Sequence, residues 1–234
     1  MIKINDLIVK AEGKEIIKGL NLELKKGINV LMGPNGSGKT TLAHTIMGNP
    51  KYSVSGSIVF NGKNIIKMKV DKRAKEGIFL SFQNPESLEG VKISHFLRTS
   101  YNSINEKIPV LEFNKLLKKK MKLLGLDFSF ATRSLKDFSG GERKKLEMLQ
   151  LLVLDSELII LDEIDSGLDV DALKQVCKNI ALLKNKIVLI ITHYRRMLHY
   201  FNVDKIFVIK KGKIIKEGNK NLAKQIEEQG YDSI

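Results

Sequence analysis

The residues most able to do chemistry form one short run in the first fifth of the chain. It starts at Gly33, has the spacing G-x-x-x-x-G-K-[ST] and reads Gly-Pro-Asn-Gly-Ser-Gly-Lys-Thr. Glycines tolerate positive φ and let backbone N–H groups close on phosphate oxygens, so we expect this of Gly33, Gly36 and Gly38. Lys39 would bring a compact cation to the β and γ phosphates, and the Thr40 hydroxyl would complete an Mg²⁺ shell. The run predicts a nucleoside triphosphate site; the alternative is a glycine-rich turn with a surface lysine.

Two carboxylates follow one of the most apolar runs of the chain. Residues 158–161 read Leu-Ile-Ile-Leu and lead directly to Asp162 and Glu163. A buried strand of this kind ends at the edge of an open α/β sheet where ligands bind. We expect Asp162 to hold Mg²⁺, directly or through water, and Glu163 to accept the proton of the water that attacks the γ phosphate. The alternative is a strand that ends in two solvated acids.

A second candidate anion site follows Phe138 and reads Ser139, Gly140, Gly141 and Glu142. The N-terminus of a helix offers unpaired N–H groups to an anion, and small residues let the anion approach the backbone. Taken alone this is a weak signal, because the same residues are also typical of an ordinary loop and helix start.

The elements that must position these residues can be predicted from hydrophobic periodicity. The predicted strands are residues 2–9, 15–23, 27–32, 57–60, 158–161 and 187–191, with a hairpin over 205–216. Helical periods cover 111–124 and 142–154, and a helix is expected between the strands at 158–161 and 187–191. Unbroken apolar strands fit a parallel sheet buried on both faces. We therefore predict one α/β domain over 1–234, with a nucleotide-binding core formed by 1–83 and 157–234 and an inserted helical subdomain at 84–156.

In combination, the motifs resemble those of the ATP-binding-cassette (ABC) ATPases in order and approximate spacing, over essentially the whole chain. Their order is the phosphate loop, Gln83, 139–142, Asp162 with Glu163, 166–169 and His193. The resemblance implies a P-loop NTPase core of ABC type, with a mixed sheet, N-terminal antiparallel strands and an inserted helical subdomain. It also implies ATP and Mg²⁺ as ligands, and hydrolysis of ATP to ADP and phosphate.

The resemblance implies roles for individual residues. The phosphates would be held by Gly33, Pro34, Asn35, Gly36, Ser37, Gly38, Lys39, Thr40 and Thr41. Two chains would sandwich two nucleotides head to tail, so that Ser139 and Gly141 of one chain contact the γ phosphate held by the other, with Gly140 in the same nucleotide-binding loop.

Three further side chains, those of Gln83, His193 and Asp169, have roles that rest on the same resemblance. Gln83 would contact Mg²⁺ and the attacking water, and His193 would bond the γ phosphate. Lys39 and Glu163 would complete the catalytic set, and Asp169 would link the two sites across the interface. For His193 the alternative is a histidine with a structural role at a strand end.

Two segments depart from the usual pattern of this family. Phe138 and Glu142 stand where leucine and glutamine are commonest. Residues 9–14 contain no aromatic side chain, although many relatives place a ring there against the adenine. A stacked ring would contribute about 1–3 kcal/mol to nucleotide binding.

Several segments resemble SufC, the ATPase branch that serves the SUF iron-sulfur cluster assembly machine. They are 162–174, 192–196, 82–85 leading to 89–91, and 227–231. This resemblance implies a SufB/SufD-type soluble scaffold as partner. The alternatives are the nucleotide-binding subunit of an ABC membrane transporter, which shares every catalytic residue, and an ATP-switched DNA-associated protein, which is disfavoured because the chain has no long coiled coil.

The partner is expected on the surface after Gln83, around Asn84–Leu97. Val91, Ile93 and Phe96 could anchor it; the alternative is that these side chains pack inside the helical subdomain.

Composition narrows the remaining classes. The formal charge is +14, but the densest lysine cluster, at 115–122, alternates with apolar residues at helical spacing and predicts a solvated helix face, so nucleic acid is an unlikely partner. Cys177 is the only cysteine, which excludes a disulfide within the chain and an iron-sulfur cluster held by its own thiolates. No apolar stretch reaches about 18 residues, so we expect no direct membrane insertion. The N-terminal residues lack the apolar core of a signal peptide, and we expect a cytoplasmic location.

Overall fold

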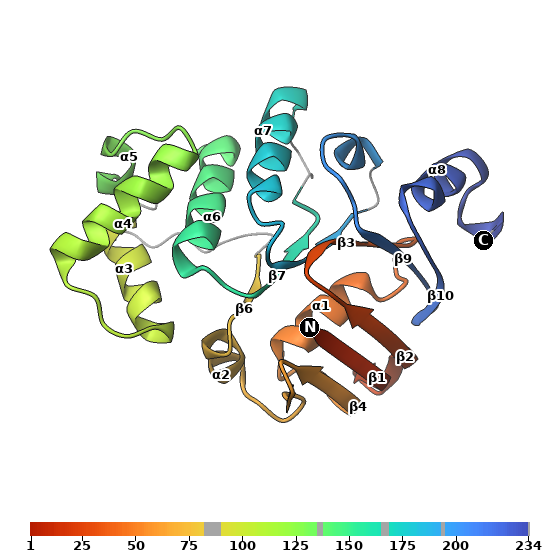
Figure 1. The fold of residues 1–234 in the computed structure, drawn as a ribbon. Helices are drawn as coiled ribbons and strands as arrows, with labels where there is room; N and C mark the ends of the chain where they lie inside the picture. Colours follow the sequence, from red (N-terminus) through yellow and green to blue (C-terminus); the bar gives the residue numbers. More distant parts are fainter. Residues whose placement is uncertain (82–89, 135–137, 165–168, 193–194, 234) are drawn as a thin grey trace.

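A computed structural model describes residues 1–81, 90–134, 138–164, 169–192 and 195–233 (Figure 1). These residues form two sheets and the helices that cover them. One sheet is antiparallel, with the order β2-β1-β4-β5, and the other is mostly parallel, with the order β10-β9-β3-β8-β7-β6.

The parallel sheet carries the motifs found in the sequence. Its strands are β3 (Gly27–Met32), β6 (Ile78–Leu80), β7 (Leu158–Asp162), β8 (Ile187–Ile191) and β9 (Lys205–Lys210), with β10 (Lys213–Gly218) antiparallel to β9 at the edge. All residues of β3, β7 and β8 are buried, which is why their sequences, apart from Asn29 and Asp162, are apolar without alternation. Ile191 pairs with Leu31 on one side and with Asp162 on the other. The register therefore brings the carboxyl ends of β3 and β7 to the same edge of the sheet.

The antiparallel sheet consists of β1 (Ile2–Ala11), β2 (Lys14–Leu24), β4 (Ser53–Phe60) and β5 (Lys63–Asn64). Its inner side chains share one hydrophobic core with helix α1 (Lys39–Met47) and with one face of the parallel sheet, so α1 is packed between the two sheets. The mixed architecture predicted from the sequence, with N-terminal antiparallel strands, is confirmed.

The other face of the parallel sheet is covered by helices. α7 (Val170–Ala181), α8 (Lys220–Gln229) and the short helix η1 (Arg195–His199) pack there in a second core. A further short helix, α2 (Val70–Lys75), precedes β6, and η2 (Tyr231–Ser233) follows α8. The helix expected between β7 and β8 is α7.

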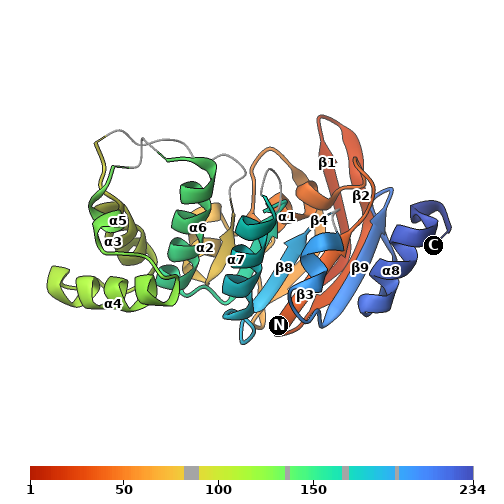
Figure 2. The ribbon, with the colours of Figure 1, turned by 90° about the horizontal axis from the view of Figure 1, so that it is seen from above.

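A group of helices follows β6 in the chain and precedes β7. It comprises α3 (Ile93–Ile104), α4 (Val110–Leu123), α5 (Ser129–Thr132) and α6 (Gly140–Leu154). In both ribbon views, α3, α4 and α5 lie at the end of the molecule opposite α8, with α6 between them and the sheet (Figures 1 and 2). The division into a core of 1–83 and 157–234 and a subdomain of 84–156 remains a prediction.

Two predictions about the helical group, one on the partner surface and one on the lysine cluster, can be compared with the structure. Ile93 is fully buried in the helical core, and Phe96 is partly buried against it, so these side chains pack inside the group as the alternative had it. The lysines of α4 lie on its exposed side, opposite the buried Phe113, Leu117 and Met121, as the periodicity predicted. No helix among the described residues is long and apolar enough to cross a membrane.

Candidate functional site

The glycine-rich run forms the turn between β3 and α1. Gly36 and Gly38 have φ of 74° and 105°, values that L side chains rarely adopt, and Gly38 is the residue before the first turn of α1. Gly33 does not have a positive φ, so that expectation was wrong. It is a glycine for another reason: a Cβ there would lie 2.2 Å from the carbonyl oxygen of Ile209 in β9.

Lys39 folds back over this loop. Its Nζ donates hydrogen bonds to the carbonyl oxygens of Gly33 (2.8 Å) and Pro34 (3.0 Å), which use two of the three ammonium donors. The side chain is buried, and burial lowers the pKa of Lys39, while the charges of Glu163 and Asp162 act in the opposite direction. The ammonium is therefore held at the loop and close to both carboxylates.

Asp162 and Thr40 form an oxygen-rich corner beside this lysine. Asp162 is 3% exposed, and burial raises the pKa of its carboxyl, while a hydrogen bond donated by the Thr40 hydroxyl acts against that rise. Among the described residues, Asp162 Oδ1 is buried without a hydrogen-bond partner. A buried carboxylate oxygen of this kind is normally satisfied by a cation or a water. The adjacent Thr40 hydroxyl oxygen is a second ligand of the type that Mg²⁺ prefers. The residues present therefore fit Mg²⁺.

Glu163 follows in an uncommon backbone conformation. Its φ is 51°, and its amide donates a 2.9 Å hydrogen bond to the carbonyl oxygen of Ile191. A non-glycine residue in the left-handed region costs of order 1–3 kcal/mol, and such residues cluster at functional sites. The turn directs the chain away from β7 immediately after Asp162, so that the two carboxylates occupy different environments.

Ser139, Gly140 and Gly141 lie at the exposed start of α6. The Ser139 hydroxyl accepts a hydrogen bond from the amide of Glu142, whose carboxylate bonds back to the Ser139 amide in a capping box. A Cβ at Gly140 or Gly141 would meet nothing within 4 Å in the chain itself. Glycine is a poor helix former, and these two leave the helix N-terminus open to a group from outside.

The remaining predicted residues divide into two groups. Asp169 precedes α7, and its carboxylate caps that helix by accepting a 2.8 Å hydrogen bond from the amide of Ala172. Its predicted role across an interface stays a prediction. Gln83 and His193 lie outside the described residues.

Sequence reasoning missed two contacts that support the phosphate loop. The amide of Gly212, in the turn between β9 and β10, donates a 3.0 Å hydrogen bond to the carbonyl oxygen of Ser37. The Tyr231 phenol is hydrogen-bonded to the backbone of Gly33. The main-chain carbonyl of Tyr231 accepts a 2.9 Å hydrogen bond from Lys210 Nζ. Lys211 and Gly212 predicted a turn, but not that the turn contacts the phosphate loop. Nothing in the sequence linked Tyr231 to a loop almost 200 residues earlier.

The structure thus joins a phosphate-loop turn, a lysine and two carboxylates at one edge of a parallel sheet, which defines a nucleotide-binding α/β protein. Residues 17–166 match the ABC transporter family. The chain belongs to this family of ATP-binding and ATP-hydrolysing cassettes.

Relatives and solved structures agree with this assignment. "Vegetative protein 296" of Bacillus subtilis is 46% identical, over 99% of this chain and 92% of its own. A protein of Streptococcus pyogenes named "Probable ABC transporter ATP-binding protein" is also 46% identical, over 100% of this chain and 94% of its own. The dimeric ATP-binding cassette MJ0796, described as bound to ADP and Pi, has the same fold, with a TM-score of 0.81, 19% identity and coverage of 94% of this chain and 99% of the cassette.

Proposed function

We propose that this chain hydrolyses ATP with the help of Mg²⁺ and uses the reaction to move a partner protein. The observation that carries the proposal is the convergence of Lys39, Thr40, Asp162 and Glu163 at the carboxyl edge of the parallel sheet. Family membership supports the reaction, and the residues supply specific roles for it.

Each of these residues has a distinct role in the proposed reaction. The backbone amides of the loop and Lys39 hold the triphosphate, and the lysine compensates the charge that develops on the transferred phosphoryl group. Thr40 and Asp162 hold Mg²⁺, which when bound neutralises phosphate charge; Gln83 is proposed as a further ligand. Glu163 orients the attacking water and accepts its proton. For this role its carboxylate must lie within hydrogen-bonding distance of that water.

We further propose that the complete site forms between two copies of the chain. Ser139, Gly140 and Gly141 are exposed at the start of α6, which belongs to the helical group, whereas the phosphate loop lies between β3 and α1 (Figures 1 and 2). The description of the related cassette as a dimer supports such an arrangement. His193 and Asp169 are proposed to complete the contacts to the γ phosphate and across the interface.

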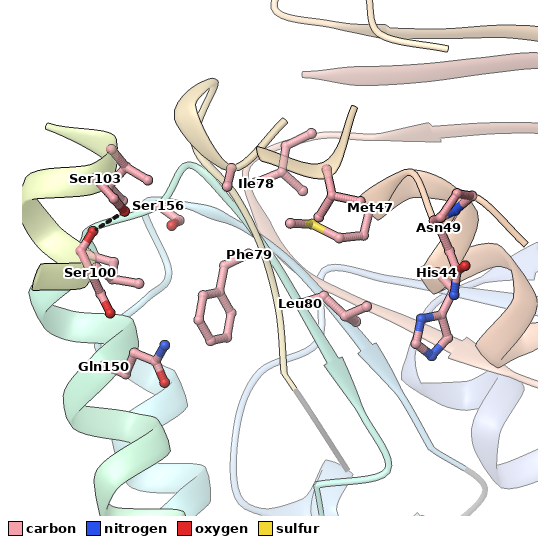
Figure 3. Close-up of a pocket in the computed structure, with 15 residues that line it drawn as sticks. His44, Met47, Asn49, Ile78, Phe79, Leu80, Ser100, Ser103, Gln150 and Ser156 are labelled. Atoms are coloured by element: carbon pink, nitrogen blue, oxygen red, sulfur yellow. Dashed lines mark hydrogen bonds between the residues drawn. The ribbon is translucent and has the colours of Figure 1, made fainter. Parts of the chain in front are cut away.

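A groove suited to a partner opens between the helical group and the core. Its volume is about 430 Å³. Figure 3 shows Phe79 and Leu80 of β6 between side chains of α3 and α6 on one side and α1 on the other. The labelled residues at the two sides are Ser100, Ser103 and Gln150 in the helical group, and His44, Met47 and Asn49 at α1. A partner in this groove would contact both parts of the chain and would move with them.

Two kinds of partner are proposed for this groove. The resemblance of several segments to SufC favours a SufB/SufD-type soluble scaffold for iron-sulfur cluster assembly, reached in the cytoplasm. Relatives named as transporter ATP-binding proteins or ATP-dependent transporters favour the other candidate, the membrane subunit of a transporter, and the comparisons support this candidate better than the scaffold.

Purification at native expression separates the two candidates. The chain carrying a photocrosslinker at Ser103, which is exposed and lines the groove on α3, is isolated from cells, and the crosslinked protein is identified. A membrane-spanning protein supports the transporter candidate and a soluble scaffold supports the assembly candidate. The matched control carries the crosslinker at Lys10, which is exposed on β1, and should not capture the same partner.

A further inference from the structure

Glu142 is hydrogen-bonded to the Ser139 hydroxyl, which is proposed to contact the γ phosphate. Ser139 Oγ donates a 3.1 Å hydrogen bond to Glu142 Oε2, and the Ser139 amide donates to the same oxygen at 3.1 Å. Glu142 therefore stabilises the start of α6. It also places a negative charge where the dianionic γ phosphate would arrive, a problem that a neutral glutamine at this position would not create.

Arg133 lies on the other oxygen of this carboxylate. Its Nη1 is 2.5 Å from Glu142 Oε1, and this hydrogen bond is the largest cause that lowers the pKa of Glu142 to about 2. The guanidinium carbon is 5.0 Å from the centre of the Phe138 ring and 5.9 Å from that of Phe130. Stacking on aromatic faces fixes the orientation of an arginine while leaving its charge in place.

The backbone of Arg133 is fixed as well. Its carbonyl oxygen accepts a 3.0 Å hydrogen bond from the amide of Ile93 at the start of α3, and the next residue, Ser134, forms a β-bridge with Lys92. Arg133 therefore joins the starts of α3 and α6 at the end of α5.

We propose that Arg133 is a positioning residue that neutralises Glu142, so that the start of α6 can accept the γ phosphate of ATP held by a second copy of the chain. The inference rests on the proposed two-copy site. When the phosphate arrives, the Ser139 hydroxyl turns its proton from Glu142 to a phosphate oxygen, and Arg133 keeps the carboxylate compensated. Without Arg133, the carboxylate and the phosphate repel each other across the interface.

The test is a double-mutant cycle read by ATP-driven dimerisation, with all variants in the Glu163→Gln background so that ATP persists. Arg133→Met should raise the ATP concentration needed for half-maximal dimerisation about tenfold, since it leaves an uncompensated charge beside the phosphate. Binding of ATP to the isolated monomer, measured at protein concentrations too low for dimers, should not change. For Arg133→Met combined with Glu142→Gln, the ATP concentration needed for half-maximal dimerisation should lie within about twofold of that for Glu142→Gln alone.

The double variant, Arg133→Met with Glu142→Gln, is the matched control for a packing defect. Both Arg133→Met chains lose the contacts with the Phe130 and Phe138 rings, so a packing defect would affect them equally. Arg133→Lys, which keeps the charge without the planar fork, should rescue most of the dimerisation.

Two results would overturn the inference: a double variant as weak as Arg133→Met, or an Arg133→Met chain that dimerises like its parent. If ATP fails to dimerise even the parent chain, the two-copy site itself fails, which is a distinguishable outcome.

Discussion

At the residue scale, the division of labour between Asp162 and Glu163 follows from their environments. Asp162 is buried beside Thr40, with one oxygen unpartnered among the described residues, whereas Glu163 sits after the strand in a left-handed turn. Glu163→Gln should keep ATP and Mg²⁺ binding and lose roughly 10²–10⁴ in hydrolysis, because only the proton acceptor is removed. Single-turnover hydrolysis in quenched flow measures this directly. A rate near that of the parent chain would assign the base to another residue.

Lys39 should act one step earlier than Glu163. Its removal takes away a cation at the phosphates and also the two bonds that tie the side chain to the Gly33 and Pro34 carbonyl oxygens. Lys39→Ala should therefore weaken ATP binding about tenfold or more, as measured by calorimetry. Lys51→Ala, which removes an exposed lysine, is the control for the loss of charge and should bind ATP like the parent. Equal affinities for all three chains would contradict the proposed phosphate loop.

At the scale of elements, the turn between β9 and β10 supports the phosphate loop. Gly212 has a φ of 80°, its amide bonds the Ser37 carbonyl oxygen, and a Cβ there would lie 2.1 Å from the carbonyl oxygen of Ile16. Gly212→Ala should lower the free energy of unfolding by about 1–3 kcal/mol, because the turn must shift away from Ile16. The shift should also weaken ATP binding, because it disturbs the hydrogen bond to the Ser37 carbonyl oxygen.

Gly62 provides the matched control for this turn. It has nearly the same φ, 82°, but a Cβ there meets nothing within 4 Å. Gly62→Ala should cost about 1 kcal/mol of stability and leave ATP affinity unchanged. Urea unfolding and calorimetry on both variants separate backbone strain from the contact with the loop. Equal ATP affinities for Gly212→Ala and the parent chain would remove the turn from the site.

The sequence predicted the elements better than their contacts. The apolar runs of β3, β7 and β8, and the motifs at their ends, were visible because burial on both faces leaves a local pattern. The positive φ expected of Gly33 was wrong, because close approach to Ile209 demanded the glycine instead. The contacts of Gly212 and Tyr231 with the loop join residues far apart in the chain, and no periodicity records such pairings.

At the scale of the whole molecule, the two halves of the proposed site lie on different parts of the chain. The phosphate loop belongs to the sheet and α1, and the open N-terminus of α6 belongs to the helical group (Figures 1 and 2). A ligand that bridges two copies would bring these parts together and would shift the population toward the closed dimer by its extra contacts. A partner in the groove between them would be carried along.

Mixed dimers test this arrangement most directly. Lys39→Ala paired with Ser139→Arg, purified as heterodimers through two different tags, contains one intact shared site but no intact single chain. The parent paired with the Lys39→Ala, Ser139→Arg double variant contains the same two substitutions, one intact chain and no intact shared site. The account predicts ATPase activity in the first heterodimer and almost none in the second. Activity in the second and none in the first would show that each site is built within one chain.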